Sequence, residues 1–338
     1  MTFTDFLLHD SLQRAIAAAG FQEPTPIQAA AIPVALTGRD LVGSAQTGTG
    51  KTAAYALPLL HRLLTAPRPT RQMRVLVLTP TRELADQVHA SIRQLARFTA
   101  LRSATVYGGV GMDPQARALR TGTDVIVACP GRLLDHAQRG AVDFRGVDCL
   151  VIDEADRMLD MGFLPDMRRI LTRLPQARQT LLFSATCAPE LTRFVAQALC
   201  DPVRVAIGMV APAETVSHAL YPVPSALKTA LLTALLQDIT SRAVLIFTRT
   251  KHRADRVAAS LTRAGYPVGV LHSNRSQQQR QRALADFRAG SVPYLVATDI
   301  AARGIDVSTV SHASNFDMPG TAYTYIHCIW RTGRAARS

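Results

Sequence analysis

Residues 45–52, which read AQTGTGKT, constrain the fold of this chain more than any other stretch. They follow the short apolar run 41–42 and precede a run rich in Ala and Leu, so the pattern predicts a strand, a glycine-bearing loop and a helix start. Such a loop binds phosphate because its glycines let backbone N–H groups converge on phosphate oxygens at the positive end of a helix dipole. Lys51 can then reach the β- and γ-phosphates, and the Thr52 hydroxyl can ligate Mg²⁺. The usual template has Gly where this chain has Ala45, so the loop alone leaves an accidental match open.

The composition indicates a packed, basic chain with room for two domains. A length of 338 residues is long for one domain and comfortable for two. Hydrophobic residues make up 48% and charged residues 19%, which argues against a disordered chain. The formal net charge of +13 favours an anionic partner, with nucleic acid the first candidate. Only three of the 38 basic residues are Lys, so a codon bias toward Arg is an alternative explanation of the Arg/Lys ratio, although not of the surplus over acids.

The basic surplus is concentrated in the second half of the chain. Residues 1–217 carry 23 basic and 19 acidic residues, whereas residues 218–338 carry 15 basic and 6 acidic residues. We therefore expect the second half to contribute strongly to binding phosphates.

The cysteines and the N-terminus suggest a reduced, cytosolic environment. The N-terminus carries Asp5 and Asp10 without a basic segment, and no apolar run approaches the ~20 residues of a membrane span, so we expect neither a signal peptide nor a membrane helix. No C-x-x-C spacing occurs, so neither a zinc site nor a disulfide framework is indicated. We interpret the five cysteines as reduced, buried thiols: Cys129, Cys149, Cys187, Cys200 and Cys328.

A stretch with two prolines, residues 21–28, links an amphipathic run at residues 8–19 to a second predicted helix. Gln28 can present one acceptor and two donors to the edge of a purine, and Phe21 can stack on its face. The structural alternative is a helix cap and a core aromatic, and the residues by themselves favour that alternative.

Buried strands alternate with helical patterns in the first half, which predicts βαβ units and a parallel sheet whose ligands lie at the carboxyl ends of the strands. Asp153 and Glu154 follow one such strand end. Two acids there suit Mg²⁺–nucleotide chemistry, one to hold the metal through water and one to orient or deprotonate the attacking water. The alternative is that they cap the next helix. The predicted strands are 74–79, 123–128, 149–152 and 180–183.

Several motifs in register carry a family resemblance. AQTGTGKT, PTRELA, CPGR, DEAD and SAT, in this order and preceded by GFQEPTPIQ, resemble the motifs of the DEAD-box ATP-dependent RNA helicases. The N-terminal opening is similar to that of the bacterial RhlE-like subgroup. The resemblance covers essentially the whole chain, and linked motifs are far more specific than any one of them. It implies two RecA-like parallel-sheet α/β domains in tandem, the superfamily 2 helicase core of the P-loop NTPases.

A second α/β set begins near His218, with predicted strands at 243–248, 268–271 and 294–297. It repeats the first architecture without the phosphate loop, so we expect it to complete a site made by the first set. Residues 201–217 lack a strong period and resemble an interdomain link. We assign an N-terminal ATP-binding domain to residues 1–208, a linker to 209–217, and a C-terminal helicase domain to 218–338, ending before the family's closing strand.

The resemblance implies ATP and Mg²⁺ as cofactors. Gln28 and Phe21 would select adenine, and Asp306 would touch the ribose. Thr52 and Asp153 would hold Mg²⁺, largely through water. The implied nucleotide-binding residues are Phe21, Gln28, Ala45, Gln46, Thr47, Gly48, Thr49, Gly50, Lys51, Thr52 and Asp306. The implied catalytic residues are Lys51, Asp153, Glu154 as the group that activates water, and the arginine fingers Arg331 and Arg334.

RNA is the implied macromolecular partner, gripped by its backbone without regard to sequence. Ser184 and Thr186 would couple hydrolysis to RNA binding. ATP and RNA would each bind across the two domains, so each lowers the cost of closure for the other. The implied RNA contacts are Arg82, Gly109, Arg132, Gln277, Arg280 and Thr298. A cytoplasmic monomer without a membrane partner is expected, whereas the RNA, the pathway and any ribosome-assembly or RNA-decay protein stay open.

The last thirty residues depart from the family pattern. Residues 327–334 read HCIWRTGR where the family has HRIGRTGR, so Cys328 replaces Arg and Trp330 replaces Gly. Glycine is needed where backbones approach closely, so the indole can displace the finger arginines. A tolerated variant or a fragment is the alternative.

Two functions follow: an RNA-stimulated ATPase that locally unwinds short duplexes, which we prefer, or an RNA-binding remodelling protein with ATP binding but impaired hydrolysis. Further departures are Cys129, Ser273, Tyr323 and the residues Ala313 and Ser314, which weaken a strand expected to be apolar.

Overall fold

The computed structural model describes residues 1–45, 48–67, 72–186, 188–207, 217–238, 243–298, 310–319 and 325. The chain divides into two compact units, Met1–Met209 (unit 1) and Val210–Ser338 (unit 2). Within the described residues, no helix combines the length and the apolar character that a membrane crossing requires.

The described residues of unit 1 form a seven-stranded parallel sheet in the order β3-β4-β2-β5-β6-β1-β7. The five inner strands are short and almost entirely buried, as expected for a parallel sheet covered on both faces. The predicted α/β fold class is confirmed. The strands are β1 Leu41–Ser44, β2 Val75–Leu78, β3 Ser103–Val106, β4 Val125–Ala128, β5 Cys149–Ile152, β6 Gln179–Ser184 and β7 Val203–Ala206.

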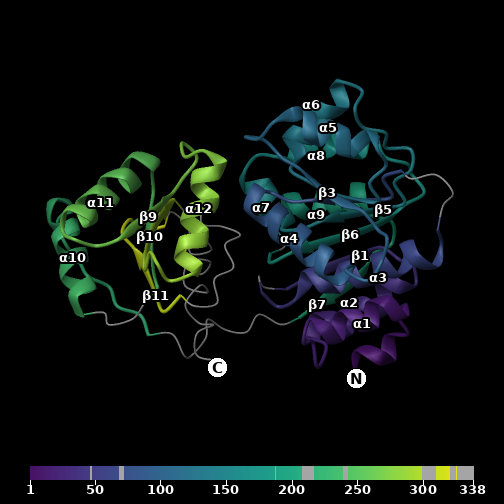
Figure 1. The fold of residues 1–338 in the computed structure, drawn as a ribbon, viewed down its shortest axis with the longest axis horizontal. Helices are drawn as coiled ribbons and strands as arrows, with labels where there is room; N and C mark the ends of the chain where they lie inside the picture. Colours follow the sequence, from purple (N-terminus) through teal and green to yellow (C-terminus); the bar gives the residue numbers. More distant parts are fainter. Residues whose placement is uncertain are drawn as a thin grey trace. The chain divides into compact units, whose positions relative to one another are not determined.

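Helices cover both faces of this sheet, with α1–α3 on one side and α6 and α8 on the other (Figure 1). Successive strand residues point to opposite faces, so Leu41 and Val42 of β1 belong to different core clusters. The helices are α1 Asp10–Ala18, α2 Pro26–Leu36, α3 Lys51–Thr65, α4 Arg82–Leu95, α5 Met112–Arg120, α6 Pro130–Gln138, α7 Ala155–Asp160, α8 Leu164–Leu171 and α9 Pro189–Ala198, preceded by a 3₁₀ turn at Phe3–Phe6.

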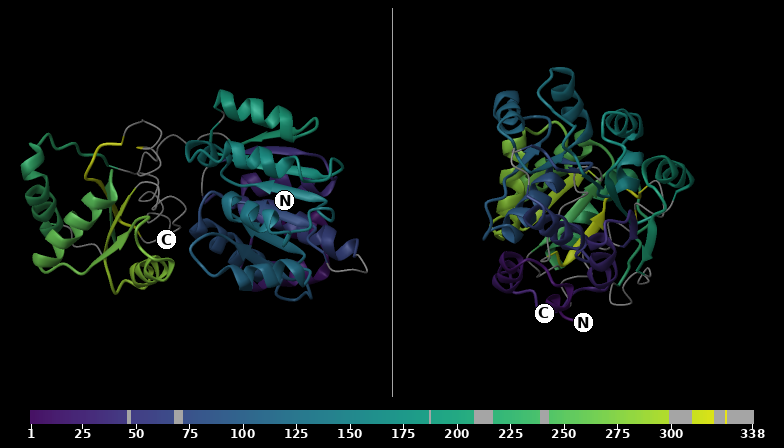
Figure 2. Two further views of the ribbon diagram at one scale, coloured as in Figure 1. Left: turned by 90° about the horizontal axis from the view of Figure 1, so that it is seen from above. Right: turned by 90° about the vertical axis from the view of Figure 1, so that its right-hand side faces the viewer.

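Unit 2 repeats the architecture on a smaller scale, with a four-stranded parallel sheet in the order β11-β8-β10-β9 among the described residues. Helices α10 and α11 pack on one face and α12 on the other (Figures 1 and 2). The elements are the 3₁₀ turn Ser225–Leu227, α10 Lys228–Asp238, β8 Val244–Thr248, α11 Lys251–Arg263, β9 Val268–Leu271, α12 Gln277–Arg288, β10 Tyr294–Thr298 and β11 His312–Asn315.

Two expectations need correction. Residues 201–217 are not all linker, because β7 lies within them and pairs with β1 at the edge of the sheet, where its residues alternate between half-buried and exposed. The expected strand that contains Ala313 and Ser314 does form, as β11 beside β8. Cys129 and Cys149 are buried free thiols as expected, but Cys200 is an exposed free thiol.

Candidate functional site

The phosphate loop has the predicted strand–loop–helix form, with β1 leading through the loop into α3. Gly48 and Gly50 adopt φ angles of 84° and 91°, a region that favours glycine. Lys51, the first residue of α3, is 6% exposed, and its Nζ donates to the carbonyl oxygen of Ala45 at 3.0 Å. Thr52 lies in the same first turn. Gln46 and Thr47 lie outside the described residues.

Gln28 connects the helix α2 to this loop. Its Oε1 accepts from the backbone N–H of Thr25 at 2.9 Å, which completes a capping box, and its Nε2 donates to the carbonyl oxygen of Gly50 at 3.1 Å. A Cβ at Gly50 would collide with this Gln28 amide. The helix-cap interpretation of Gln28 is therefore right, and the same amide also ties the cap to the phosphate loop. Phe21 is 37% exposed beside Phe3, so it is not a core aromatic.

Asp153 lies at the end of β5 with its two carboxylate oxygens in different surroundings. Oδ2 accepts from the buried hydroxyl of Tyr55 at 3.0 Å, while Oδ1 is buried without a hydrogen-bond partner among the described residues. Burial raises the pKa of Asp153 to about 6, Lys51 opposes the shift, and Glu154 adds to it. Burial, followed by the Asp153 charge, raises the pKa of Tyr55, so its hydroxyl stays protonated and donates.

The orphaned Asp153 oxygen fits a magnesium ion. A buried carboxylate oxygen without a donor is stabilised by a cation or by water bound to one. Within the described residues, no three His, Cys, Asp or Glu side chains gather to hold a metal by themselves. Mg²⁺ keeps several waters and is bound by one or two carboxylates plus nucleotide phosphates, so a donor set of Asp153 and Thr52 suffices.

Glu154 adopts a left-handed backbone conformation with φ 54° at the N-cap of α7. Its carboxylate is buried and forms an ion pair with the equally buried guanidinium of Arg157. A buried carboxylate and a buried guanidinium each need a partner of opposite charge, and here each supplies the other's. The expected role of Glu154 in activating water would require this carboxylate to engage water as well as Arg157.

Asp156 is a residue that the sequence analysis missed. Its Oδ2 accepts three hydrogen bonds, from the backbone N–H groups of Ala185 and Thr186 at 3.1 and 3.0 Å and from the Thr186 hydroxyl at 3.0 Å. The Ser184 hydroxyl donates to the Thr186 carbonyl at 2.6 Å. Strands β5 and β6 are parallel neighbours, so the segments that follow them meet at one sheet edge. Asp156 therefore links the acidic motif to the predicted coupling residues. The sequence did carry one signal for Asp156. It is a third acid after one predicted strand, and Ser184 and Thr186 follow another predicted strand.

Three predicted RNA contacts of unit 1 converge on one loop. The Arg82 guanidinium, at the start of α4, packs so closely against Gly109 that a Cβ there would collide with it, and Gly109 has φ 82°. Arg132 of α6 donates from Nη1 to the carbonyl oxygen of Val110 at 3.0 Å. Two guanidinium groups beside exposed backbone form a cationic surface suited to phosphates.

The remaining predicted residues belong to unit 2. Gln277 begins α12, Arg280 lies one turn later, and Thr298 ends β10. The residues Asp306, Arg331 and Arg334, and the altered positions Cys328 and Trp330, lie outside the described residues.

Two family models match the chain. The DEAD/DEAH box helicase model matches residues 25–194, and the helicase conserved C-terminal domain model matches residues 227–336. The chain belongs to the DEAD/DEAH box helicase family.

Named relatives of this helicase family are similar over almost the whole chain. The chain is 43% identical to DEAD-box ATP-dependent RNA helicase 28 of Oryza sativa subsp. japonica, covering 99% of this chain and 42% of that protein. It is 43% identical to DEAD-box ATP-dependent RNA helicase 30 of Arabidopsis thaliana, and the match covers 98% of this chain and 57% of that protein. It is 41% identical to the ATP-dependent RNA helicase RhlB of Erwinia tasmaniensis, and the match covers 98% of this chain and 79% of that protein. The chain thus spans about half the length of the two plant relatives.

Solved helicase structures share the fold. Dbp5 of S. cerevisiae, bound to RNA and ADP BeF3, is 32% identical with a TM-score of 0.85, over 98% of this chain and 86% of that one. A DEAD box protein from Methanococcus jannaschii is 34% identical with a TM-score of 0.60, and the match covers 99% of this chain and 90% of that one. Two tandem parallel-sheet α/β domains of the DEAD-box helicase type are therefore the fold of this chain.

Proposed function

We propose that this chain is an ATP-dependent RNA helicase, an RNA-stimulated ATPase that locally unwinds short duplexes. The observation that carries the proposal is the double contact of the acidic motif 153–156. Asp153 accepts from Tyr55 of the helix that follows the phosphate loop, and Asp156, three residues later in the chain, accepts from Thr186. A nucleotide bound at Asp153 can therefore change the position of the segment that contains Thr186, which lies at the same sheet edge. Dbp5, which is similar over nearly the whole chain, is bound to RNA and ADP BeF3.

Each residue of the nucleotide site has a role in this proposal. Gln28 and Phe21 recognise adenine, and residues 45–52 with Lys51 cradle the phosphates. Thr52 and Asp153 would hold Mg²⁺, which neutralises charge on the phosphate oxygens and orients them when bound. Glu154 orients and deprotonates the attacking water. Asp306, Arg331 and Arg334 complete the site from the second domain, the arginines stabilising charge as the terminal phosphate leaves.

RNA is held by its backbone, so the affinity depends on salt more than on sequence. Arg82, Gly109 and Arg132 contact it from unit 1, and Gln277, Arg280 and Thr298 from unit 2. The basic excess of residues 218–338 supports the contribution of unit 2. Ser184 and Thr186 couple the two ligands. Closure of an N-terminal domain (1–208) on a C-terminal domain (218–338) about a linker (209–217) bends the gripped strand and disfavours a continuous duplex.

The finer assignments also belong to this proposal. The opening of the chain supports membership in the bacterial RhlE-like subgroup, and we infer a cytoplasmic monomer that needs no membrane. The alternative of an RNA-binding protein with impaired hydrolysis is not favoured, because the relatives described above are named as RNA helicases.

Phosphate release with and without single-stranded RNA tests the proposal directly. We expect RNA to raise the ATPase rate of the wild-type chain, and Lys51→Ala to remove the activity at all RNA concentrations. An unchanged rate on adding saturating RNA, with ATP still bound, would reject the proposed function.

A further inference from the structure

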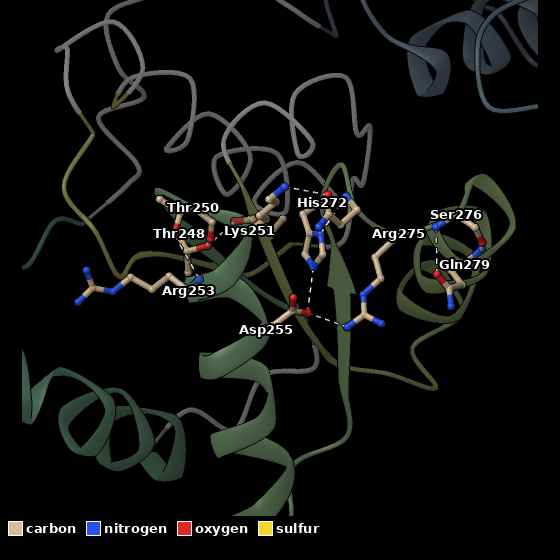
Figure 3. Close-up of polar contacts among 11 residues, drawn as sticks. Thr248, Thr250, Lys251, Arg253, Asp255, His272, Arg275, Ser276 and Gln279 are labelled. Atoms are coloured by element: carbon tan, nitrogen blue, oxygen red, sulfur yellow. Dashed lines mark hydrogen bonds and ion pairs between the residues drawn. The ribbon is translucent and has the colours of Figure 1, made fainter.

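A polar cluster in unit 2 fastens the turn between β9 and α12 to the first two turns of α11 (Figure 3). Lys251 Nζ donates to Asn274 Oδ1 at 2.9 Å, and Asp255 Oδ1 accepts from Arg275 Nη2 at 2.7 Å and lies 2.9 Å from His272 Nε2. Lys251 and Asp255 are four residues apart, so they project from one face of α11. We call these five residues the α11 clamp.

The clamp fixes the hydrogen-bonding state of His272, which is 1% exposed. The backbone N–H of Asn274 donates to His272 Nδ1 at 3.3 Å, so Nδ1 is an acceptor and Nε2 carries the proton that is donated to Asp255. The backbone N–H of Arg275 donates to the His272 carbonyl at 3.1 Å. Every polar atom of this imidazole is therefore engaged, and the orientation of the turn is tied to the Asp255 carboxylate.

The turn passes directly into α12. Ser276 is the N-cap, its hydroxyl accepts from the backbone N–H of Gln279 at 3.3 Å, and Gln279 Oε1 accepts from the Ser276 N–H at 3.0 Å. Gln277 is the first helical residue, and Arg280 lies one turn later. The clamp thus ends two residues before Gln277, and any tilt of the turn would move both side chains.

We propose that Asp255 is a positioning residue for RNA, which holds α12 through His272 and Arg275 so that Gln277 and Arg280 face the sugar-phosphate backbone. The inference rests on the proposed function, in which these two residues grip RNA. Contacts that are held in place before binding lose less conformational freedom on binding, so a fixed α12 raises affinity without adding a contact.

The direction in which RNA affinity changes when Asp255 is removed separates a positioning role from an effect of charge alone. Asp255 is an acid near a predicted phosphate-binding helix, so removal of its charge alone would strengthen RNA binding. Positioning predicts the opposite, because without the carboxylate His272 and Arg275 lose their shared acceptor. Asp255→Asn removes the charge but keeps an oxygen that can accept both hydrogen bonds.

The first experiment measures the affinity of the full chain for a single-stranded RNA oligonucleotide by fluorescence anisotropy at fixed salt. We expect Asp255→Ala to weaken binding about tenfold and Asp255→Asn to stay within about twofold of the wild type. Asp286→Ala is the matched control, because Asp286 lies on α12 and only its side chain's pairing with Arg282 would be lost. Tighter binding by Asp255→Ala, or equal weakening by Asp255→Asn, would overturn the inference.

A double-mutant cycle tests whether Asp255 acts through α12. If it does, Asp255→Ala adds little to the loss caused by Arg280→Ala, and each single variant lowers the slope of log affinity against log salt by about 0.7. Independent, additive losses would contradict positioning.

Amide hydrogen exchange of residues 272–280 in the free protein gives a readout without RNA. We expect faster exchange in Asp255→Ala than in Asp255→Asn or the wild type, and unchanged exchange would overturn the clamp. If the wild-type chain bound no RNA, the proposed function itself would fail. If Arg280→Ala weakened RNA binding while Asp255→Ala did not, only the inference about Asp255 would fail.

Discussion

Unit 1 and unit 2 both start a helix with a lysine directly after a loop that follows a buried parallel strand. In unit 1, α3 starts at Lys51 behind Gly50, which has φ 91° and no side chain to cap the helix. In unit 2, α11 starts at Lys251 behind Thr250, whose φ is −132° and whose hydroxyl accepts from the backbone N–H of Arg253 at 3.2 Å. The glycine leaves helix N–H groups to a phosphate, whereas the threonine satisfies one of them internally.

The same two helices differ again one turn later. Tyr55, four residues after Lys51, donates to Asp153. Asp255, four residues after Lys251, holds the turn that leads to α12. In our proposals, the same helical turn therefore serves nucleotide chemistry in unit 1 and orients an RNA-binding helix in unit 2.

The two lysines should give the largest contrast. We expect Lys51→Ala to lower the ATPase rate by at least about 10²-fold, because the proposed function assigns this charge to the transferred phosphate. Lys251→Ala should leave nucleotide affinity intact and weaken RNA binding by only a few fold. Calorimetric titration with ADP and phosphate release separate the two variants. Similar loss of nucleotide affinity in both would break the comparison.

Removal of Asp156 should cost stability in unit 1. Asp156→Ala removes the acceptor of the Ala185 N–H and of the Thr186 hydroxyl, and leaves the Thr186 N–H with only the Ser184 hydroxyl oxygen at 3.2 Å, at a cost of about 2–3 kcal/mol in unfolding free energy. Asp156→Asn should lie between Asp156→Ala and the wild type, because its amide keeps one acceptor oxygen. Urea unfolding measures the series, and a fully stable Asp156→Ala would show that the link to Thr186 contributes nothing.

The raised pKa of Asp153 predicts a stability that depends on pH. The folded state binds this proton more tightly than the unfolded state, so stability is highest below the ordinary carboxyl pKa and falls as pH rises through about 4 to 6. Asp153→Asn should flatten this fall and stabilise the nucleotide-free protein at pH 7 by on the order of 2 kcal/mol, while it abolishes ATPase activity. Thermal unfolding across this pH window measures the effect. Parallel profiles for variant and wild type would contradict it.

Tyr55→Phe should have the smallest effect. It deletes one buried hydrogen bond to Asp153 and keeps the ring against Phe183, so the expected loss is about 1 kcal/mol. Because the hydroxyl lowers the pKa of Asp153, its removal should shift the fall in stability to higher pH. Unfolding curves at pH 5 and pH 7 measure both effects, and a variant more stable than the wild type at pH 7 would contradict the assigned hydrogen bond.

The sequence predicted the parallel sheets well because buried parallel strands are continuous apolar runs. Residues 149–152 match the fully buried β5, and residues 268–271 match β9, which is apolar although it is a half-buried strand at the edge of the described sheet. It missed the edge strands β3 and β7. β3 has Ser and Thr at half-buried positions and β7 has Arg at an exposed one, so neither is a continuous apolar run. Motif spacing likewise located the phosphate loop.

Spacing did not reveal which polar groups bond to one another. Asp156 was overlooked because its partners at Ala185 and Thr186 lie on the next strand's end, and only the sheet register brings them together. For Gln28 the sequence left a purine contact and a helix cap as alternatives. The structure shows the cap, together with a contact to Gly50 that the sequence did not predict.

The measurement that tests the account most directly is RNA affinity with and without a non-hydrolysable ATP analogue. If nucleotide and RNA are bound by cooperating units, the analogue must tighten RNA binding, and RNA must tighten analogue binding by the same factor. We predict a reciprocal change of about tenfold or more in the wild-type chain and none in Lys51→Ala. Equal RNA affinity in both conditions would contradict the account.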